Sequence, residues 1–138
     1  PDLEREDKAC IVLCRTSNPG AGELQDLDVD GVPLWETVAT RVRDAWNEKG
    51  NCLLVLGATY PAELARAREL CPDLAFLVPG VGAQGGDAAA VVTNGLAANG
   101  RGLLINSSRG VIFADDPAAE AKALRDEIRA AVAAVAGS

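Results

Sequence analysis

The sequence predicts an α/β fold built on a parallel sheet, because short apolar segments alternate regularly with helix-like segments. Four apolar runs of strand length lie near residues 10–14, 52–56, 74–78 and 103–105. Runs in which polar and apolar residues do not alternate are typical of strands covered on both faces, as in parallel sheets and barrels. A strict order of strand, loop and helix favours parallel strands. Both a small doubly wound domain and half of a (β/α)8 TIM barrel fit this order.

Three features favour the half barrel. Polar side chains follow all four apolar runs, so a barrel would gather them at one mouth; these groups are Ser17, Thr59, residues 80–84 and residues 106–109. The last two strands are followed by a glycine-rich loop at residues 80–87 and by a loop with an arginine at residues 106–110. Both loops look suited to phosphate, and barrels often bind phosphate with the loops after their last two strands. The length of 138 residues is also about half of the roughly 250 residues of a full barrel.

We therefore number these strands 5 to 8 and predict that residues 1–138 form the C-terminal half of a single barrel domain. The N-terminal half, with strands 1 to 4, is not in this chain. Half a barrel has two unpaired strand edges and an open core, which are unfavourable in water. The chain should therefore need the N-terminal half of the same barrel as a partner.

The predicted helices carry recognisable start and stop signals. Residues 33–49 place apolar side chains at helical spacing, and residues 61–71 begin at one proline and stop before another. Asp87 is placed to cap a helix that begins just after a glycine-rich loop. A last amphipathic helix is predicted over residues 117–136, with an aspartate just before it as its cap.

Residues 20–32 predict an acidic surface loop. Within them, Asp26, Asp28, Asp30 and Gly31 match four positions of a calcium-binding EF-hand loop. The glutamate that should complete such a loop falls one residue early, and a proline and a tryptophan interrupt the pattern. A solvated acidic loop is therefore the better interpretation.

Residues 74–113 carry the strongest functional pattern. Four glycines lie among the eight residues from Gly80 to Asp87, and glycines let the backbone approach a ligand and adopt positive φ. The helix that follows would favour an anion at its N-terminus, and phosphate is the natural ligand. The next strand ends in the sequence NSSRG at residues 106–110, where the planar guanidinium of Arg109 could bind the same phosphate.

Two other interpretations of these glycines are possible. A G-x-G-x-x-G pattern, the dinucleotide fingerprint, starts at Gly80, but it needs an acidic residue about 20 positions further on. The chain has Asn106 and Arg109 there, and a proline precedes the first glycine. The glycines could also serve only a tight turn from strand to helix. Ser17, after the first strand, is similarly either a ligand donor or a turn residue.

Charge and composition disfavour several classes of function. A net charge of -7 and a pI near 4.5 argue against nucleic acid or an anionic membrane as a partner. The chain has no histidine and no C-x-x-C pair, so it predicts no metal site, and its four cysteines are predicted to be reduced and structural. The lack of histidine also removes Ser-His-Asp and Cys-His nucleophiles. No signal peptide or long apolar run occurs, which predicts a cytoplasmic protein.

Four motifs along the chain agree with one known family. They are CRTSNPGA at residues 14–21, GATYP at 57–61, PGVGAQGGD at 79–87 and NSSRG at 106–110. In this order and spacing they resemble the second half of orotidine 5′-phosphate decarboxylase, and they are most similar to the longer bacterial branch of that family. Four motifs in register are much more specific than any one of them.

The resemblance implies a (β/α)8 barrel that removes the carboxylate of orotidine 5′-monophosphate and gives UMP, in de novo pyrimidine biosynthesis, without a metal or a cofactor. It implies that Ser17 bonds the pyrimidine ring and that Gln84 and Arg109 hold the phosphate. The loop that closes over the nucleotide would contain Pro79, Gly80, Val81, Gly82 and Gln84. The family resemblance also implies a homodimer.

One departure from the family is informative. Its chemistry rests on alternating lysines and aspartates that include a D-x-K-x-x-D sequence near strand 3, and no such sequence occurs here. Lys8, Lys49 and Lys122 do not lie at the carboxyl end of a predicted strand. We therefore assign no catalytic acid or base to this chain and expect them on the missing half, with a further aspartate from the dimer partner. The alternative function is a non-catalytic phosphate-binding half barrel that associates with itself.

Overall fold

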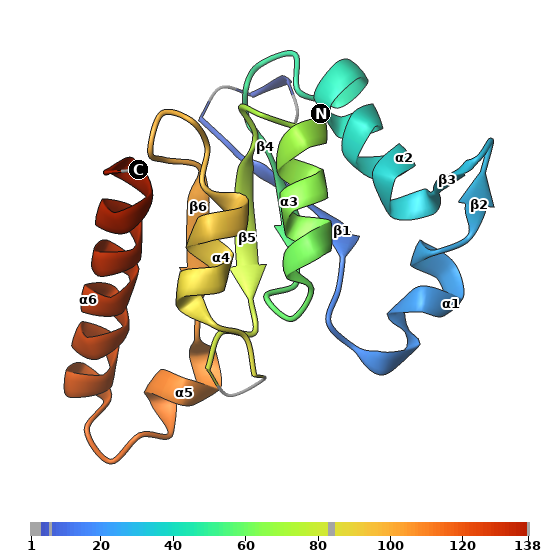
Figure 1. The fold of residues 1–138 in the computed structure, drawn as a ribbon. Coiled ribbons are helices and arrows are strands. Elements are labelled where there is room, and N and C mark those ends of the chain that lie inside the picture. The colour runs from blue at the N-terminus through green and yellow to red at the C-terminus, as the bar shows by residue number, and fades with distance from the viewer. Residues whose placement is uncertain (1–3, 6, 83–84, 138) are drawn as a thin grey trace.

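Figure 1 shows the computed structural model, which describes residues 4–5, 7–82 and 85–137. Its main sheet contains β1 (Cys10–Arg15), β4 (Cys52–Leu56), β5 (Ala75–Pro79) and β6 (Leu103–Asn106). All three strand pairings are parallel, and their registers place Cys10 opposite Cys52, Leu53 opposite Ala75, and Phe76 opposite Leu103. The four strands predicted from the apolar runs are confirmed.

These strands follow one another in the sheet in the same order as in the chain, β1-β4-β5-β6. Because connections between parallel strands are right-handed in nearly all proteins, a sequential order brings the connecting helices to one face. Helices α3 (Pro61–Leu70) and α4 (Ala88–Gly95) lie on the same face of the sheet in Figure 1. A doubly wound domain would reverse its strand order and carry helices on both faces. The observed order therefore supports the predicted half barrel.

The predicted helices form, and two of them are capped by aspartate. Helix α2 (Leu34–Arg41) continues into one π-helical turn, η3 (Val42–Trp46), and the last helix is α6 (Pro117–Ala136). The Asp87 carboxylate accepts hydrogen bonds from the first free N–H groups of α4, at 2.7 and 3.2 Å. Asp116 caps α6 in the same way, with two bonds of 3.0 Å. Both predicted caps are confirmed.

Two segments that were predicted to be loops contain regular structure. The acidic segment near residues 20–32 includes η2 (Pro19–Ala21), α1 (Gly22–Gln25) and a hairpin of β2 (Asp28–Val29) and β3 (Val32–Pro33). Its turn residues, Asp30 and Gly31, have φ of 54° and 89°, as expected for the Asp-Gly pair of a type I′ turn. After β6, the expected loop becomes the short helix α5 (Ser108–Ile112).

The main sheet has one covered face and one open face. Side chains that point toward the helices, such as Leu54, Phe76 and Val78, are completely buried. Alternate positions point to the other face, where Leu13 is 63% and Leu104 is 51% exposed. The sequence predicted strands covered on both faces, and within the described residues the chain covers only one. An apolar face of this kind is what barrel strands turn toward the barrel axis.

Arg68 joins the amino ends of the strands to the ends of two helices. Its guanidinium lies 3.8 Å from the centre of the Phe76 ring, and burial lowers the pKa of Arg68 to about 10. It donates hydrogen bonds of 2.7 to 3.2 Å to five backbone carbonyls, those of Cys71, Pro72, Leu74, Gly95 and Gly102. These carbonyls lie just after α3, at the end of α4 and in the turns that lead into β5 and β6. One side chain therefore fixes how these four elements meet.

Arg68→Lys should lower the free energy of unfolding by about 1–3 kcal/mol, because a lysine cannot reach five carbonyls and leaves buried acceptors without a donor. Urea denaturation followed by tryptophan fluorescence measures the change. The matched control is Arg101→Lys at an exposed arginine close to Gly102, which should change stability by less than about 0.5 kcal/mol. Equal effects at the two positions would contradict the role given to Arg68.

Candidate functional site

The described residues of the predicted site lie where strands of the main sheet end. Ser17 follows β1, Pro79 is the last residue of β5, and Arg109 lies in the first turn of α5, directly after β6. Because the strands are parallel, their carboxyl ends share one edge of the sheet. Gln84 lies outside the residues that the structure describes.

Two adjoining hollows lie along this edge. The first has a volume of about 450 Å³ and is lined by Ser17 and Pro79, among others. The second, of about 60 Å³, is lined by Pro79, Gly80, Val81 and residues 106–109. Pro79 lines both hollows. The structure therefore brings the loop after β5 together with the loop that carries Arg109, and places Ser17 beside them.

A hydrogen bond joins the loops after β5 and β6. Ser107 Oγ donates to the backbone oxygen of Val81 at 3.0 Å. A Cβ atom at Gly82 would lie 3.5 Å from this hydroxyl, and one at Gly110 would lie 2.6 Å from it. Gly82 and Ser107 also line a third hollow, of about 490 Å³, beside α6. The glycine-rich loop and the arginine loop thus meet as predicted. Ser107 was predicted only as one of the polar groups at the mouth, and the structure shows that it joins the two loops.

The glycine-rich loop needs its glycines for its own conformation. Gly80, Gly82 and Gly85 have φ of 99°, 76° and 85°, which side-chain-bearing residues rarely adopt. A Cβ atom at Gly86 would lie 2.5 Å from the Ala58 Cβ atom and 2.7 Å from the oxygen of Gly80. The loop is also closed by its own hydrogen bonds, from the N–H of Gly82 to the oxygen of Gly86 at 2.9 Å and from the N–H of Gly86 to the oxygen of Gly80 at 3.1 Å.

Backbone N–H groups of the glycine-rich loop and of the start of α4 are partly used within the chain. The amides of Gly82, Gly85 and Gly86 bond inside the loop, and the first amides of α4 bond to Asp87. The glycine-rich loop therefore offers a phosphate fewer free N–H groups than its glycines alone suggested. Arg109 is exposed and lines the small hollow, so its guanidinium is free to meet an anion there.

Ser17 lies against the loop that follows β4. A Cβ atom at Gly57 would overlap the Ser17 hydroxyl and come within 3.0 Å of the Ser17 nitrogen, so the glycine makes room for the serine. The N–H of Gly57 donates to the oxygen of Arg15 at 2.8 Å, which fixes the two loops side by side. Thr59, in the same loop, lines the hollow of Ser17, and its buried hydroxyl has no partner among the described residues. This position fits a ligand donor.

The cysteines and lysines of the described chain provide no nucleophile or base at this end of the sheet. Burial raises the pKa of Cys14 to about 12 and also raises the pKa values of Cys52 and Cys71, so these thiols stay protonated at neutral pH. None of the three lysines lines the hollows described above.

Within the described ranges, no three potential metal ligands gather in one place. In the same ranges, no helix is long and apolar enough to cross a membrane.

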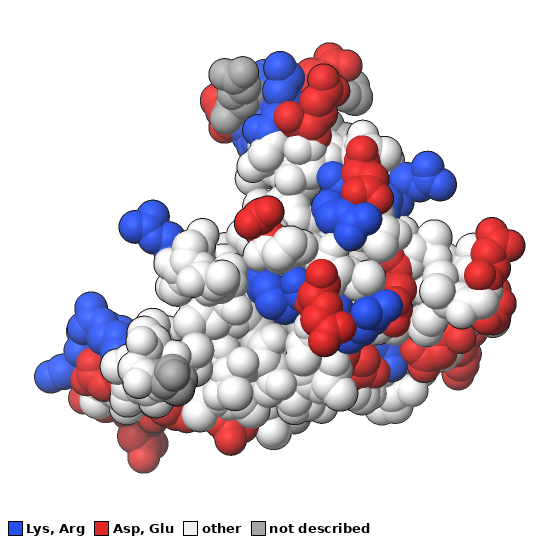
Figure 2. All heavy atoms as spheres, turned by 45° about the horizontal axis from the view of Figure 1, so that its top comes forward, with Lys and Arg blue, Asp and Glu red and all other residues white. Residues whose placement is uncertain are grey.

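Charged side chains on the surface lie in mixed groups. On the face in Figure 2, basic and acidic side chains lie side by side and form no broad basic patch. Among the described ion pairs, Arg66 meets Glu36 at 3.0 Å and Glu69 at 3.2 Å. A phosphate must therefore be held by local contacts, because the chain as a whole is acidic.

The sequence profile of the orotidine 5′-phosphate decarboxylase / HUMPS family matches residues 2–124, which is most of the chain. The chain belongs to this family. The family membership predicted from the four motifs is confirmed.

Curated relatives named orotidine 5′-phosphate decarboxylase are similar over much of this chain. The protein of Cellvibrio japonicus is 54% identical over 132 residues, which cover 94% of this chain and 48% of that protein. The protein of Aromatoleum aromaticum is 59% identical over 115 residues, which cover 83% of this chain and 42% of that protein. The chain thus spans about half the length of the curated relatives that it matches.

Solved structures of similar proteins also match nearly all of this chain and half or less of their own length. The structure of Leishmania donovani OMP decarboxylase matches with a TM-score of 0.87 at 48% identity, and the match covers 94% of this chain and 50% of that chain. The structure of Leishmania donovani UMP synthase matches with a TM-score of 0.91 at 52% identity, covering 94% of this chain and 29% of that chain. The predicted α/β half of a (β/α)8 barrel is confirmed.

Ser107→Ala should loosen the glycine-rich loop, because it removes the hydrogen bond to Val81. Loss of about 1 kcal/mol would make amide hydrogen exchange at residues 80–82 and 85–86 about fivefold faster. Mass spectrometry of the exchanging protein measures this. Ser108→Ala, which removes only an exposed bond to Asn106, is the control and should leave the exchange unchanged. The same acceleration in both variants would show that the bond to Val81 does not hold the loop.

Proposed function

We propose that this chain is the C-terminal half, strands 5 to 8, of an orotidine 5′-phosphate decarboxylase. The complete enzyme is a carboxy-lyase that converts orotidine 5′-monophosphate to UMP in de novo pyrimidine biosynthesis. One observation carries the proposal: in a chain that belongs to this family, the loops after β5 and β6 meet through the hydrogen bond from Ser107 to Val81. No observation favours the alternative, a non-catalytic half barrel that associates with itself.

The nucleotide would lie along the two adjoining hollows. The hollow beside Ser17 would take the base and its sugar, and the small hollow beside Arg109 would take the phosphate. Ser17 then bonds the pyrimidine ring. The planar guanidinium of Arg109 can bond two phosphate oxygens at once, with Gln84 as a second phosphate ligand. Residues 79–82 close over the nucleotide between these two ends.

This half would contribute binding energy rather than acid–base chemistry. In the reaction the bond between the ring carbon and the carboxylate breaks, the electron pair stays on that carbon, and a proton replaces the CO2. Contacts of Arg109 and Ser17 lie away from this bond, and they can hold the loop closed and offset the desolvation of the carboxylate. The lysines and aspartates that act on the reacting carbon are assigned to the other half. No metal or cofactor takes part in this scheme.

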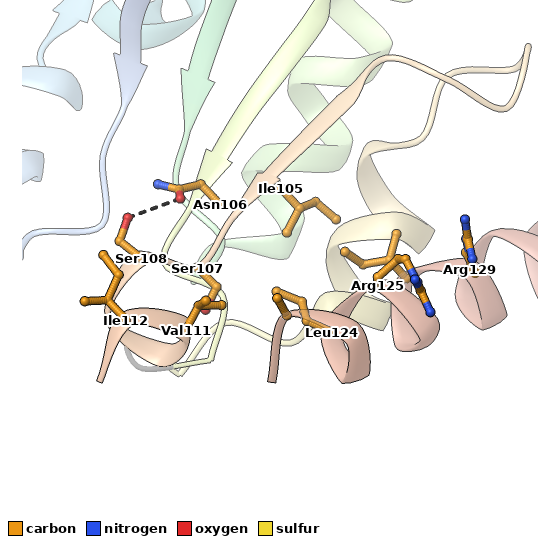
Figure 3. Close-up of a pocket in the computed structure, with 11 residues that line it drawn as sticks. Ile105, Asn106, Ser107, Ser108, Val111, Ile112, Leu124, Arg125 and Arg129 are labelled. Atoms are coloured by element: carbon orange, nitrogen blue, oxygen red, sulfur yellow. Dashed lines mark hydrogen bonds between the residues drawn. The ribbon is translucent and has the colours of Figure 1, made fainter. Parts of the chain in front are cut away.

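The N-terminal half of the same barrel is the proposed partner at the open face and free edges of the sheet. In the described sheet, β1 and β6 each pair with one strand only. Beside β6, a hollow of about 660 Å³ is lined by Ile105 and, from α6, by Leu124, Arg125 and Arg129 (Figure 3). A further strand and helix placed here would remove apolar surface from water. The homodimer implied by the resemblance and the cytoplasmic location predicted from the sequence belong to the same proposal.

Arg109→Ala in the complete enzyme should lower kcat/KM for orotidine 5′-monophosphate by on the order of 10²-fold, because a charged contact to the phosphate is lost. Steady-state kinetics measure this effect. Urea denaturation should show no loss of stability, since the side chain is exposed. Arg41→Ala, at an exposed arginine of α2, is the control and should have normal kinetics. An unchanged kcat/KM in Arg109→Ala would rule out the phosphate role.

Leu13→Glu should prevent assembly of the barrel halves, whereas Leu24→Glu should not. The two leucines are 63% and 66% exposed in this chain, but Leu13 lies on the open sheet face and Leu24 lies on α1. An unpaired carboxylate inside the barrel would destabilise it by about 3–5 kcal/mol, so the halves should bind each other at least about 10²-fold more weakly. Calorimetric titration of one separately produced half with the other measures this. Equal weakening by both variants would contradict the barrel-axis position of Leu13.

A further inference from the structure

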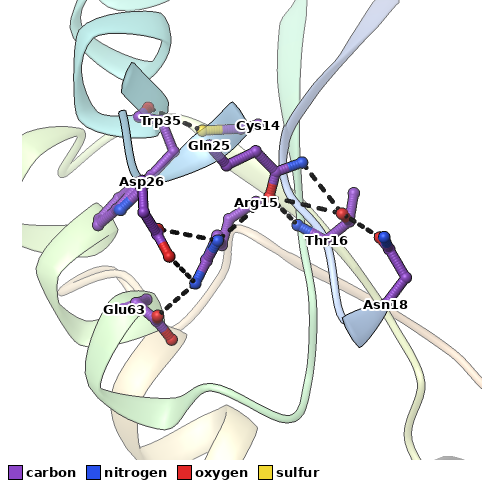
Figure 4. A network of polar contacts seen from close by, with 8 residues as sticks. All are labelled: Cys14, Arg15, Thr16, Asn18, Gln25, Asp26, Trp35 and Glu63. Atoms are coloured by element: carbon purple, nitrogen blue, oxygen red, sulfur yellow. Dashed lines mark hydrogen bonds and ion pairs between the residues drawn. The ribbon is translucent and has the colours of Figure 1, made fainter. Parts of the chain in front are cut away.

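A buried arginine stands at the end of β1, next to the loop that carries Ser17. Arg15 is only 6% exposed, and its guanidinium meets Asp26 at 3.0 Å and Glu63 at 3.1 Å (Figure 4). The same group lies 4.9 Å from the centre of the Tyr60 ring. Burying a guanidinium is unfavourable unless charged and polar groups surround it in good geometry. Here they are Asp26, directly after α1, and Glu63 in α3, so Arg15 joins the segments that follow β1 and β4.

From Arg15, a chain of hydrogen bonds leads to the residues on both sides of Ser17. Gln25 Oε1 accepts from an Arg15 nitrogen at 3.4 Å and from the Thr16 N–H at 3.0 Å, and Gln25 Nε2 donates to Thr16 Oγ1 at 3.0 Å. Thr16 Oγ1 in turn donates to Asn18 Oδ1 at 2.5 Å (Figure 4). Both ends of the Gln25 amide are therefore used to hold the loop around Ser17.

The loop after β4 lies against Ser17 from the other side and restricts the position of its side chain. Gly57 has no side chain to push the serine away, and its N–H bonds the oxygen of Arg15. Glu63 lies in the first turn of α3, so the ion pair to Arg15 also fixes the segment that contains Thr59. Neither Arg15 nor Gln25 lines the hollow that Ser17 and Thr59 share.

We propose that Arg15 and Gln25 are positioning residues that hold Ser17 in the orientation that reads the base of the nucleotide. The inference rests on the proposed function. The two side chains make no contact with the nucleotide and act through Thr16 and Asn18, on either side of the serine. Their effect should fall on recognition of the base and should spare the phosphate, whose proposed ligand Arg109 lies on another loop.

The test compares two ligands in the complete enzyme, UMP and ribose 5-phosphate, which lacks the base. Gln25→Ala should weaken UMP binding about tenfold to 100-fold, the range in which small misplacements of a binding group act. The affinity of the same variant for ribose 5-phosphate should stay within about twofold of the wild-type affinity, because the phosphate contacts are unchanged. Glu23→Gln, on the exposed side of the same short helix, is the matched control and should change neither.

A double-mutant cycle with Ser17→Ala decides whether Gln25 acts through the serine. If it does, adding Gln25→Ala to Ser17→Ala should weaken UMP binding by less than about threefold further, whereas independent effects would multiply. Should Gln25→Ala fail to fold, Gln25→Met removes both hydrogen-bonding ends of the side chain while keeping its length, and it should weaken UMP binding in the same way.

Two outcomes would overturn the inference: equal loss of affinity for UMP and ribose 5-phosphate, or multiplying effects in the cycle. Each would mean that Gln25 only stabilises the loop. A complete wild-type enzyme without decarboxylase activity would instead overturn the proposed function. The binding measurements would still decide the role of Gln25 in that case, because they require no turnover.

Discussion

The molecule depends on a parallel sheet that its own helices cover on one side only. Because the strands pair in the order in which they occur, α3 and α4 pack on one face, and the apolar side chains of the other face, such as Leu13, remain open. Because the strands are also parallel, all their carboxyl ends lie at one end of the sheet, where the hollows of Ser17 and Arg109 adjoin. The arrangement of the sheet thus explains both the place of the candidate site and the open face that we propose is covered by the other half of the barrel.

The proposed site would let an acidic chain bind an anion. With a net charge of -7, it has no general attraction for phosphate, and the amides of its glycine-rich loop bond to one another. The glycines shape the loop, the bond from Ser107 to Val81 ties it to the next loop, and Arg109 is left to meet the ligand. In the proposed arrangement, the orientation of side chains such as Arg109 would matter more than the overall field of the protein.

Much of the fold could be predicted because its signals are local. Unbroken apolar runs mark the four strands, and Asp87 and Asp116 mark the starts of α4 and α6. The hairpin had a local signal too, the Asp30-Gly31 pair between two valines, but its acidic residues fit a solvated loop equally well. Helix α5 is only five residues long and contains serine, glycine and the β-branched residues valine and isoleucine, so its sequence gives little helical signal.

By itself, the sequence determined the strand and helix order, the helix caps and the motifs that mark the family, because each depends on residues a few positions apart. The tertiary structure decided which distant side chains meet: Ser107 with Val81, 26 positions apart, and Arg15 with Glu63, 48 positions apart. It also decided which sheet face stays open. Such contacts depend on how the whole sheet and its helices pack, and no pattern within one segment specifies them.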